Sequence, residues 1–277
     1  MIQLNRPILS KKATDKLKLY QTIIDKQPDL PAQVTMAKID FPKKNVSGNK
    51  TFDEVKLGLI QMSSGAERCH YCEDSKADEV EHFLPKDVYP DQCYSWSNYF
   101  YSCGPCNNKK GNKCAIIDTQ NGQLIDTTPP KTNKTNPLSP LPTPPPPGIQ
   151  AFINFETENP LIFFLLDLQN GSFEFSELPN INTIDYTRAK YTLETLRLNK
   201  RAFLRKARQQ AYGDFKARLT EYIHHRNQTT PISQINKMIE EIKTHSHPTV
   251  WKEMIRQRFQ IPELQNLFNQ APEAIYW

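Results

Sequence analysis

The sequence predicts an α+β protein in which helices flank a small cysteine-bearing module and a short antiparallel sheet. Apolar residues recur at helical spacing near both ends of the chain, and two CxxC pairs lie in its first half. A segment with alternating apolar residues and an Asn-Gly pair lies just beyond the midpoint. With 277 residues, of which 38% are hydrophobic, the chain can bury a core and form one or two domains.

Helices are expected ahead of the first CxxC pair. In residues 13–27, Leu17 and Tyr20 belong to an apolar series with the spacing of one helical face. In residues 51–64, Thr51 is a suitable N-cap before a second series of this kind. Two or three helices should therefore form an N-terminal lead.

The six cysteines all lie within one short stretch of the first half. Because the N-terminus lacks the apolar core of a signal peptide, we expect a cytoplasmic protein, in which disulfide bonds are rare. Two CxxC pairs can place four thiolates around one tetrahedral zinc ion, and four thiolates leave no open position for a substrate. A structural zinc site is therefore predicted, with the ligands Cys69, Cys72, Cys103 and Cys106. The remaining Cys93 and Cys114 should be buried or spare thiols.

The rest of the chain divides at a proline-rich stretch. Residues 127–148 lack apolar periodicity, which indicates a linker or an extended loop. Residues 149–178 alternate between apolar and polar, which predicts two or three antiparallel strands, and helical spacing follows. We therefore expect one domain over residues 1–126, and a second over residues 149–277 with a β-hairpin and an α-helical, partner-binding half.

Charge and hydropathy limit the kinds of partner. A formal net charge of +5 and a pI of about 8.7 are compatible with a polyanionic partner and equally with an ordinary solvated surface. The apolar run at residues 160–168 is far shorter than the about 20 residues of a membrane helix. No membrane association is expected.

Residues 67–115 resemble the HNH endonucleases. Glu81-His82 and Asn98 lie between the CxxC pairs, and Asn107 follows the second pair directly. In that family a two-stranded hairpin and a helix, the ββα-metal motif, surround one catalytic cation, and many members add a zinc ion bound by four cysteines. The resemblance implies a zinc-braced module that cleaves phosphodiester bonds, with DNA as the expected substrate and RNA such as tRNA as the alternative.

The resemblance also implies roles for individual residues. His82 corresponds to the general base, and Asn98 to the residue that holds the loop beside it. Glu81 and Asn107 correspond to the protein ligands of the catalytic cation, and oxygen donors of this kind suit Mg²⁺ or Mn²⁺. The last motif position is asparagine rather than histidine, and an acid precedes His82; both variants occur in the family.

Basic residues near the motif are candidate contacts to nucleic-acid phosphates. Lys109, Lys110 and Lys113 follow the second CxxC pair, and Arg201 and Arg205 belong to a basic helical region further on. For the two arginines, a solvated helix face is the alternative interpretation.

A narrower resemblance joins the module to the C-terminal half. The segments RCHYCE, VEHFLPK, SWSNYFYSCGPCNNKKGNK and LETLRLNKRAFLRKAR are similar to those of the HNH subunit of Septu-type anti-phage systems and of related retron-associated HNH proteins. This implies an ABC/SMC-like ATPase on a second chain, because this chain has no GxxxxGK[ST] loop of its own. The alternative to catalysis is a zinc-braced nucleic-acid-binding or scaffold protein.

Overall fold

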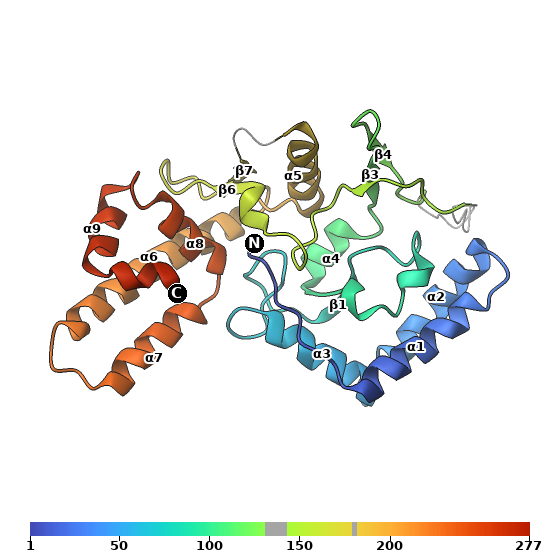
Figure 1. Ribbon diagram of the computed structural model, residues 1–277, viewed down its shortest axis with the longest axis horizontal. Helices are drawn as coiled ribbons and strands as arrows, with labels where there is room; N and C mark the ends of the chain where they lie inside the picture. The colour runs from blue at the N-terminus through green and yellow to red at the C-terminus, as the bar shows by residue number, and fades with distance from the viewer. Residues whose placement is uncertain (131–142, 179–181) are drawn as a thin grey trace.

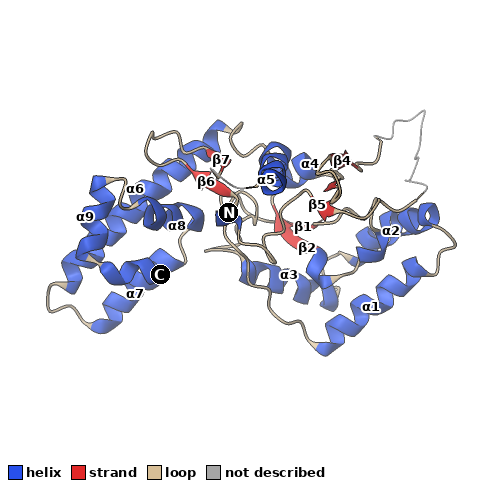
Figure 2. Cartoon of the chain, turned by 45° about the horizontal axis from the view of Figure 1, so that its top comes forward, coloured by secondary structure: helices blue, strands red, loops and turns tan. Residues whose placement is uncertain are grey.

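The computed structural model describes residues 1–130, 143–178 and 182–277 and has a mixed α+β fold (Figure 1). Residues 131–142, which belong to the expected linker, lie outside this description. N-terminal helices come first, small antiparallel sheets occupy the middle of the chain, and the C-terminal half is helical (Figure 2). This order of elements confirms the predicted fold class.

Three helices form the N-terminal lead, α1 (Lys11–Asp25), α2 (Leu30–Lys44) and α3 (Lys50–Met62). The side chains of Ser10 and Asn49 cap α1 and α3, so α3 begins just before the cap expected at Thr51. Helix α2 lacks a clear apolar period and contains Pro42 in its last turn, which is why the sequence pattern did not reveal it. Its Phe41 is nevertheless buried and faces the module.

The cysteine-bearing module is an antiparallel hairpin followed by a short helix. Strand β1 (Glu79–His82) pairs with β2 (Tyr99–Ser102) in a register that sets His82 opposite Tyr99. Helix α4 (Gly104–Lys110) follows β2 after Cys103, and Gly111 is its C-cap. Gly111 has a φ of +49°, a conformation that glycine adopts at little cost. The ββα arrangement expected from the sequence is therefore present.

Two further small sheets follow the module. Strand β3 (Ala115–Ile117) pairs with both β4 (Leu124–Asp126) and β5 (Ile149–Gln150), so the chain beyond the proline-rich stretch returns to the module. A Cβ atom at Gly148 would lie 2.7 Å from the carbonyl oxygen of Ile117, which explains a glycine at this close approach. Strands β6 (Phe164–Leu166) and β7 (Phe175–Glu177) form the expected hairpin.

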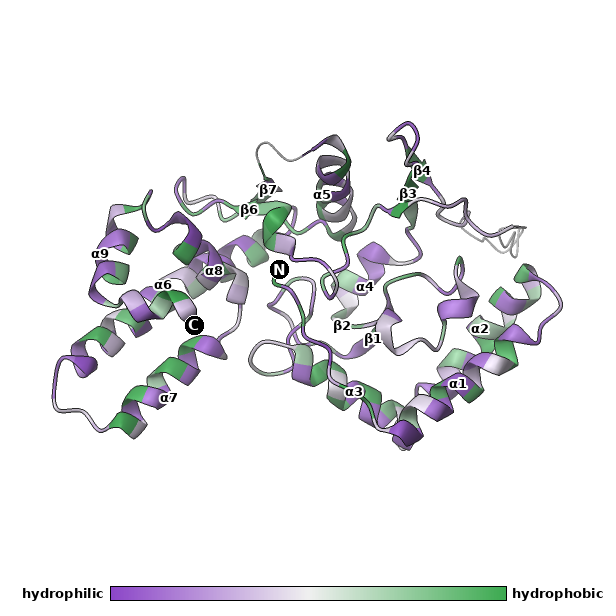
Figure 3. Cartoon of the chain, in the orientation of Figure 1, coloured by the Kyte–Doolittle hydropathy of each residue, from purple (hydrophilic) through white to green (hydrophobic). Residues whose placement is uncertain are grey.

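The C-terminal half consists of the helices α5 (Thr183–Leu196), α6 (Ala202–Arg226), α7 (Ile232–Lys243), α8 (Pro248–Gln257) and α9 (Pro262–Gln270). Apolar and polar residues alternate along α7 and α9 as on amphipathic helices (Figure 3). One set of buried apolar residues extends from Met1 to Ala274 and includes members of the N-terminal helices, the module and the C-terminal helices. None of the described helices is both long and apolar enough to span a membrane.

Candidate active site

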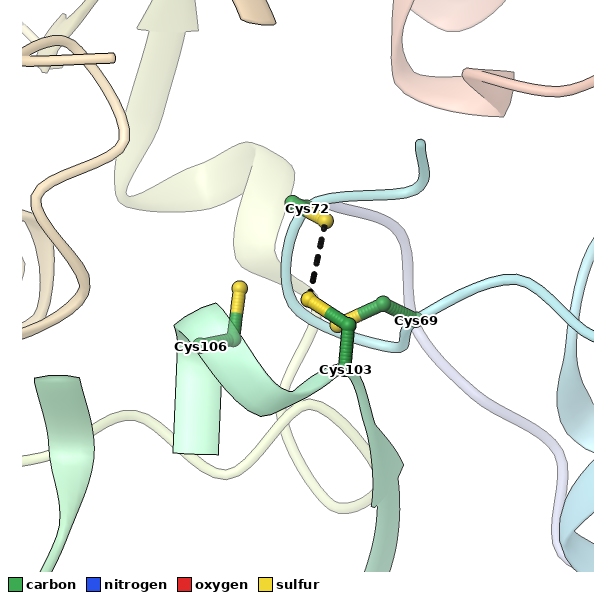
Figure 4. A group of neighbouring side chains, drawn as sticks. All are labelled: Cys69, Cys72, Cys103 and Cys106. Carbon is green, nitrogen blue, oxygen red and sulfur yellow. Dashed lines mark hydrogen bonds between the residues drawn. The ribbon is translucent and has the colours of Figure 1, made fainter. Parts of the chain in front are cut away.

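The four cysteines of the two CxxC pairs come together beside the hairpin. Cys69 and Cys72 lie in the loop before β1, while Cys103 and Cys106 lie at the end of β2 and in α4 (Figure 4). Their sulfur atoms all lie within 4.8 Å of one another, and all four thiols are buried and free of disulfide bonds. Tetrahedral zinc with bonds of about 2.3 Å separates its sulfurs by about 3.8 Å, and the Sγ atoms of Cys72 and Cys103 are 3.9 Å apart. The group is thus compatible with a structural zinc ion.

The other two cysteines lie outside this group. Burial raises the pKa of Cys93 to about 12, so its thiol is protonated and unreactive at neutral pH. Cys114 is also buried, and its Sγ lies 3.9 Å from Oε1 of Gln150. Neither residue could act as a fifth ligand, because a tetrahedral zinc is complete with four.

A separate pocket of about 290 Å³ lies at the C-terminal end of β1. The cysteines lie near the other end of this strand. Glu81 and His82 of β1 and Asn107 of α4 line it, together with Phe41 of α2 and Lys86. The structure therefore brings together three of the four residues that the resemblance assigned to catalysis and to the cation.

His82 is held in one orientation and one tautomer. Its Nε2 lies 2.9 Å from the carbonyl oxygen of Cys93, and because a carbonyl can only accept, Nε2 carries the proton and Nδ1 has the free lone pair. The ring packs edge-on against Phe41, with centroids 4.4 Å apart. Burial lowers the pKa of His82 to about 3, and the Lys86 charge acts in the same direction. The imidazole is therefore neutral at physiological pH.

Glu81 lies in a network of buried polar groups. Its Oε1 accepts a hydrogen bond of 2.5 Å from Nζ of Lys110, and its Oε2 accepts one from the hydroxyl of Tyr71. Lys110 also donates to the carbonyl oxygen of His82, at 2.7 Å. Burial raises the pKa of the Glu81 carboxyl, and the positive charge of Lys110 opposes this shift.

The position of Lys110 corrects the prediction that this lysine contacts phosphate. Its side chain has no exposed surface, and its ammonium is paired with Glu81. Lys110 therefore supports the end of β1 from inside the module, and a nucleic acid on the surface could not reach its ammonium group in this conformation.

Asn107 is oriented by an acidic residue that the sequence comparison did not single out. Its Nδ2 donates to Oε2 of Glu79, at 2.5 Å, which leaves the amide oxygen as the atom able to bind a cation. Glu79 and Glu81 are two positions apart on β1, so their side chains leave the strand on the same face. The alternation in the segment EVEH was the available signal for a second carboxylate here.

The donor set fits a hard divalent cation. An ionised carboxylate has about four lone-pair sites, so Glu81 can still accept beyond its bonds to Lys110 and Tyr71. Carboxylate and amide oxygens are the ligands that Mg²⁺ and Mn²⁺ prefer. With Asn107, the pocket thus offers two oxygen donors and room for water molecules.

Asn98 lies behind the pocket rather than in it. Its Oδ1 accepts from the backbone N–H of Leu84, at 2.7 Å, and its Nδ2 donates to the carbonyl oxygens of Leu84 and Gln92, at 3.0 and 2.9 Å. These bonds join the chain just after His82 to the segment that carries Cys93, whose carbonyl oxygen holds the histidine ring. The contacts agree with a role in positioning the loop.

No protein-family model matches the chain. It is similar to Septu protein PtuB from Bacillus thuringiensis, with 38% identity over 94 residues. The two proteins are distant and partial homologues. The match covers 31% of this chain and 36% of the relative, so this chain aligns with only about a third of the PtuB length.

The other basic residues that were predicted to contact nucleic-acid phosphates lie in different surroundings. Lys109 is exposed and follows Asn108, which lines the pocket, and Lys113 is partly buried. Arg205 forms an ion pair with Glu174 in which both side chains are about 40% exposed. Arg201 lies directly before α6, and its Nη2 donates to Sγ of Cys106, at 3.2 Å, so this arginine contacts the four-cysteine group.

Proposed function

We propose that this protein is a metal-dependent endonuclease of the HNH type that cleaves phosphodiester bonds, with DNA as its main substrate. One observation carries the proposal, namely that Glu81, His82 and Asn107 line a single pocket on a ββα unit. The partial homology to Septu protein PtuB supports a function in anti-phage defence.

His82 supplies the general base in this proposal. Its ring is neutral, and Nδ1 has the free lone pair because Nε2–H is bonded to Cys93. As the oxygen of a water molecule forms a bond to phosphorus, one of its protons passes to Nδ1. The bond between phosphorus and the 3′ oxygen breaks, and that oxygen leaves with the bonding electrons and takes a proton from solvent.

Glu81 and the amide oxygen of Asn107 would hold Mg²⁺ or Mn²⁺. Such an ion, when bound, stabilises the negative charge that develops on the phosphate and on the leaving oxygen. The chain itself fixes both ligands, since Lys110 orients Glu81 and Glu79 orients Asn107. Preorganisation of this kind limits the reorganisation that the reaction would otherwise require.

The phosphate backbone is proposed to contact Lys109 and the N-terminal helices. Residues 1–50 contain ten lysine and arginine residues and only four acidic residues, so they account for the basic character of the whole chain. Helix α2 of this region also supplies a wall of the pocket through Phe41. A basic surface next to the cleavage site would attract nucleic acid at low salt.

The test is cleavage of plasmid DNA and of total RNA by purified protein with Mg²⁺ or Mn²⁺. Replacing His82 by Ala or Gln should lower the rate by about 10²- to 10⁴-fold, because a positioned base contributes about that much. The glutamine side chain fills more of the space beside Phe41 than alanine does. This variant therefore controls for a loss of activity that is caused by unfolding. His224→Ala, at an exposed position on α6, is the matched control and should cleave normally.

The outcomes separate the alternatives. Undiminished cleavage by both His82 variants would refute the catalytic assignment. Binding without cleavage by the wild type would favour the zinc-braced nucleic-acid-binding or scaffold protein, and cleavage of RNA alone would favour a tRNA-type nuclease. One observation favours the scaffold alternative, namely that both carboxylate oxygens of Glu81 already accept hydrogen bonds within the chain.

We also propose that the protein acts with an ABC/SMC-like ATPase encoded nearby, on the basis of its Septu resemblance. Of two aromatic residues of the C-terminal half that could anchor a partner, Trp251 is buried in the core, whereas Phe259 is 65% exposed. The ATPase should co-purify with full-length wild-type protein and with His82→Ala, and Phe259→Ala should weaken the complex. Separate elution of the two proteins on size exclusion would contradict this proposal.

A further inference from the structure

Arg201 links the C-terminal half to the four-cysteine group. It lies directly before α6, almost a hundred positions after Cys106, yet its Nη2 donates to the Cys106 sulfur at 3.2 Å. Its Nε and Nη1 are buried and have no hydrogen-bond partner within the described residues. Removing a guanidinium from water costs free energy when it makes so few hydrogen bonds. A nearby negative charge would offset this cost.

A zinc ion bound by the four cysteines would supply that charge. Four thiolates around one Zn²⁺ carry a net charge of −2, which is spread over the sulfur atoms. A guanidinium donor at one sulfur offsets part of this charge, in the way that hydrogen bonds to metal ligands commonly do. Arg201 therefore belongs to the zinc group, although no CxxC spacing could have indicated it.

The segment around Arg201 is fixed on both sides. Asn199 accepts from the backbone N–H of Phe175 and donates to its carbonyl oxygen, at 2.8 and 2.6 Å, which ties the segment to β7. Arg208, one and a half turns into α6, donates to the carbonyl oxygens of Phe173 and Leu198, at 2.8 and 3.3 Å. The LRLN segment thus presents Arg201 to the cysteines from a rigid base.

A second set of contacts joins the zinc loop to α8. Glu73 directly follows Cys72, and its carboxylate accepts from the backbone N–H and the hydroxyl of Thr249, at 3.1 and 2.7 Å. The next residue, Asp74, lies 3.3 Å from Nε2 of His247, at the start of the same helix. The loop that carries two zinc ligands therefore holds the N-terminus of α8.

We propose that the zinc–thiolate group holds the C-terminal helices against the hairpin module. Arg201 is a positioning residue in this contact, hydrogen-bonded to a zinc ligand. Zinc binding then orders the starts of α6 and α8 as well as the two CxxC loops. This inference does not depend on the proposed nuclease activity.

The first test measures zinc affinity by competition with a chromophoric chelator. Arg201→Gln should weaken zinc binding about 10- to 100-fold, as loss of a hydrogen bond to a metal ligand typically does. Arg201→Lys retains the positive charge, so its zinc affinity should fall less than that of Arg201→Gln. Arg205→Gln, one turn further along α6 at the partly exposed ion pair with Glu174, is the matched control and should bind zinc like the wild type.

The second test follows amide hydrogen exchange in the full-length protein with zinc and after its removal. Zinc removal from the wild type should speed exchange at the starts of α6 and α8, and Arg201→Gln should do so at α6 while zinc is still bound. Thr249→Val should speed exchange at α8 alone. Wild-type zinc affinity in both Arg201 variants, or unchanged exchange in α6 and α8 after zinc removal, would overturn the proposal.

Discussion

The four-cysteine group and the pocket at His82 lie on the same hairpin and helix but differ in composition. The cysteine group has four identical side chains, which would saturate one zinc ion and leave no open position for a substrate. The pocket has unlike groups, an imidazole, a carboxylate and an amide, around about 290 Å³ of open volume. One small unit therefore combines a closed group of four thiols with an open pocket of mixed polar groups.

The two sites also differ in what surrounds them. Arg201, directly before α6, donates to Cys106, and Thr249 of α8 donates to Glu73, directly after Cys72; both contacts span long sequence separations. The pocket is supported mainly within the module, by Lys110 and Asn98, and from α2 by Phe41, whose ring packs against His82. Perturbing the first site should affect the whole chain, whereas perturbing the second should affect mainly the module.

The largest effect is expected from replacing a zinc ligand. Cys69→Ser or Cys106→Ser should abolish zinc binding and unfold the module, since a structural zinc contributes about 10–16 kcal/mol, as much as the whole stability of a typical domain. Zinc content and circular dichroism measure both effects. Cys114→Ser, outside the four-cysteine group, should retain one zinc per chain. Full zinc content in Cys106→Ser would show that the group is not the metal site.

A smaller but substantial loss is expected at the buried ion pair of the pocket. Lys110→Met leaves the Glu81 carboxylate buried without its cation, which should cost about 3–5 kcal/mol in denaturant unfolding. Adding Glu81→Gln should recover much of this loss, because the second change removes the unpaired charge. If Lys110→Met alone were as stable as the wild type, the Lys110–Glu81 pair would not be buried in solution.

Two glycines allow the contact between the loop after α3 and the C-terminal half to be tested. Both Gly65 and Gly122 have positive φ, so alanine at either position should cost about 1–2 kcal/mol. Only at Gly65 would the new Cβ lie 2.7 Å from the carbonyl oxygen of Thr244, just beyond α7. Gly65→Ala should therefore destabilise more than Gly122→Ala, and equal losses would argue against this close approach.

The smallest effect on stability is expected at the exposed neighbour of Lys110. Lys109→Gln should leave unfolding within about 0.5 kcal/mol of the wild type. On duplex DNA it should reduce the slope of log K against log salt concentration by about 0.9, which corresponds to one phosphate contact. Lys237→Gln, at an exposed position on α7, should leave the slope unchanged. If the slope is unchanged in Lys109→Gln, Lys109 does not contact a phosphate group of the DNA.

Much of the module could be predicted because its determinants are local. A CxxC pair forms its turn within four residues, so the spacing of the two pairs indicates a common metal site. The ligand group was therefore available from the cysteine spacing, whereas the hairpin with its helix and the pocket residues were expected only from the resemblance to the HNH endonucleases. Helix α2 was missed because Pro42 and a weak apolar period obscure its pattern.

The sequence by itself determined which residues could bind metal, and the tertiary structure decided which charges are buried. Lys109 and Lys110 are adjacent and chemically identical, but neighbours on a helix differ by about 100° in direction, so only Lys110 turns into the hairpin and meets Glu81. Arg201 likewise reaches Cys106 only because β7 and α6 pack beside the module. Such contacts depend on distant segments meeting in space, and a local pattern contains no information about that.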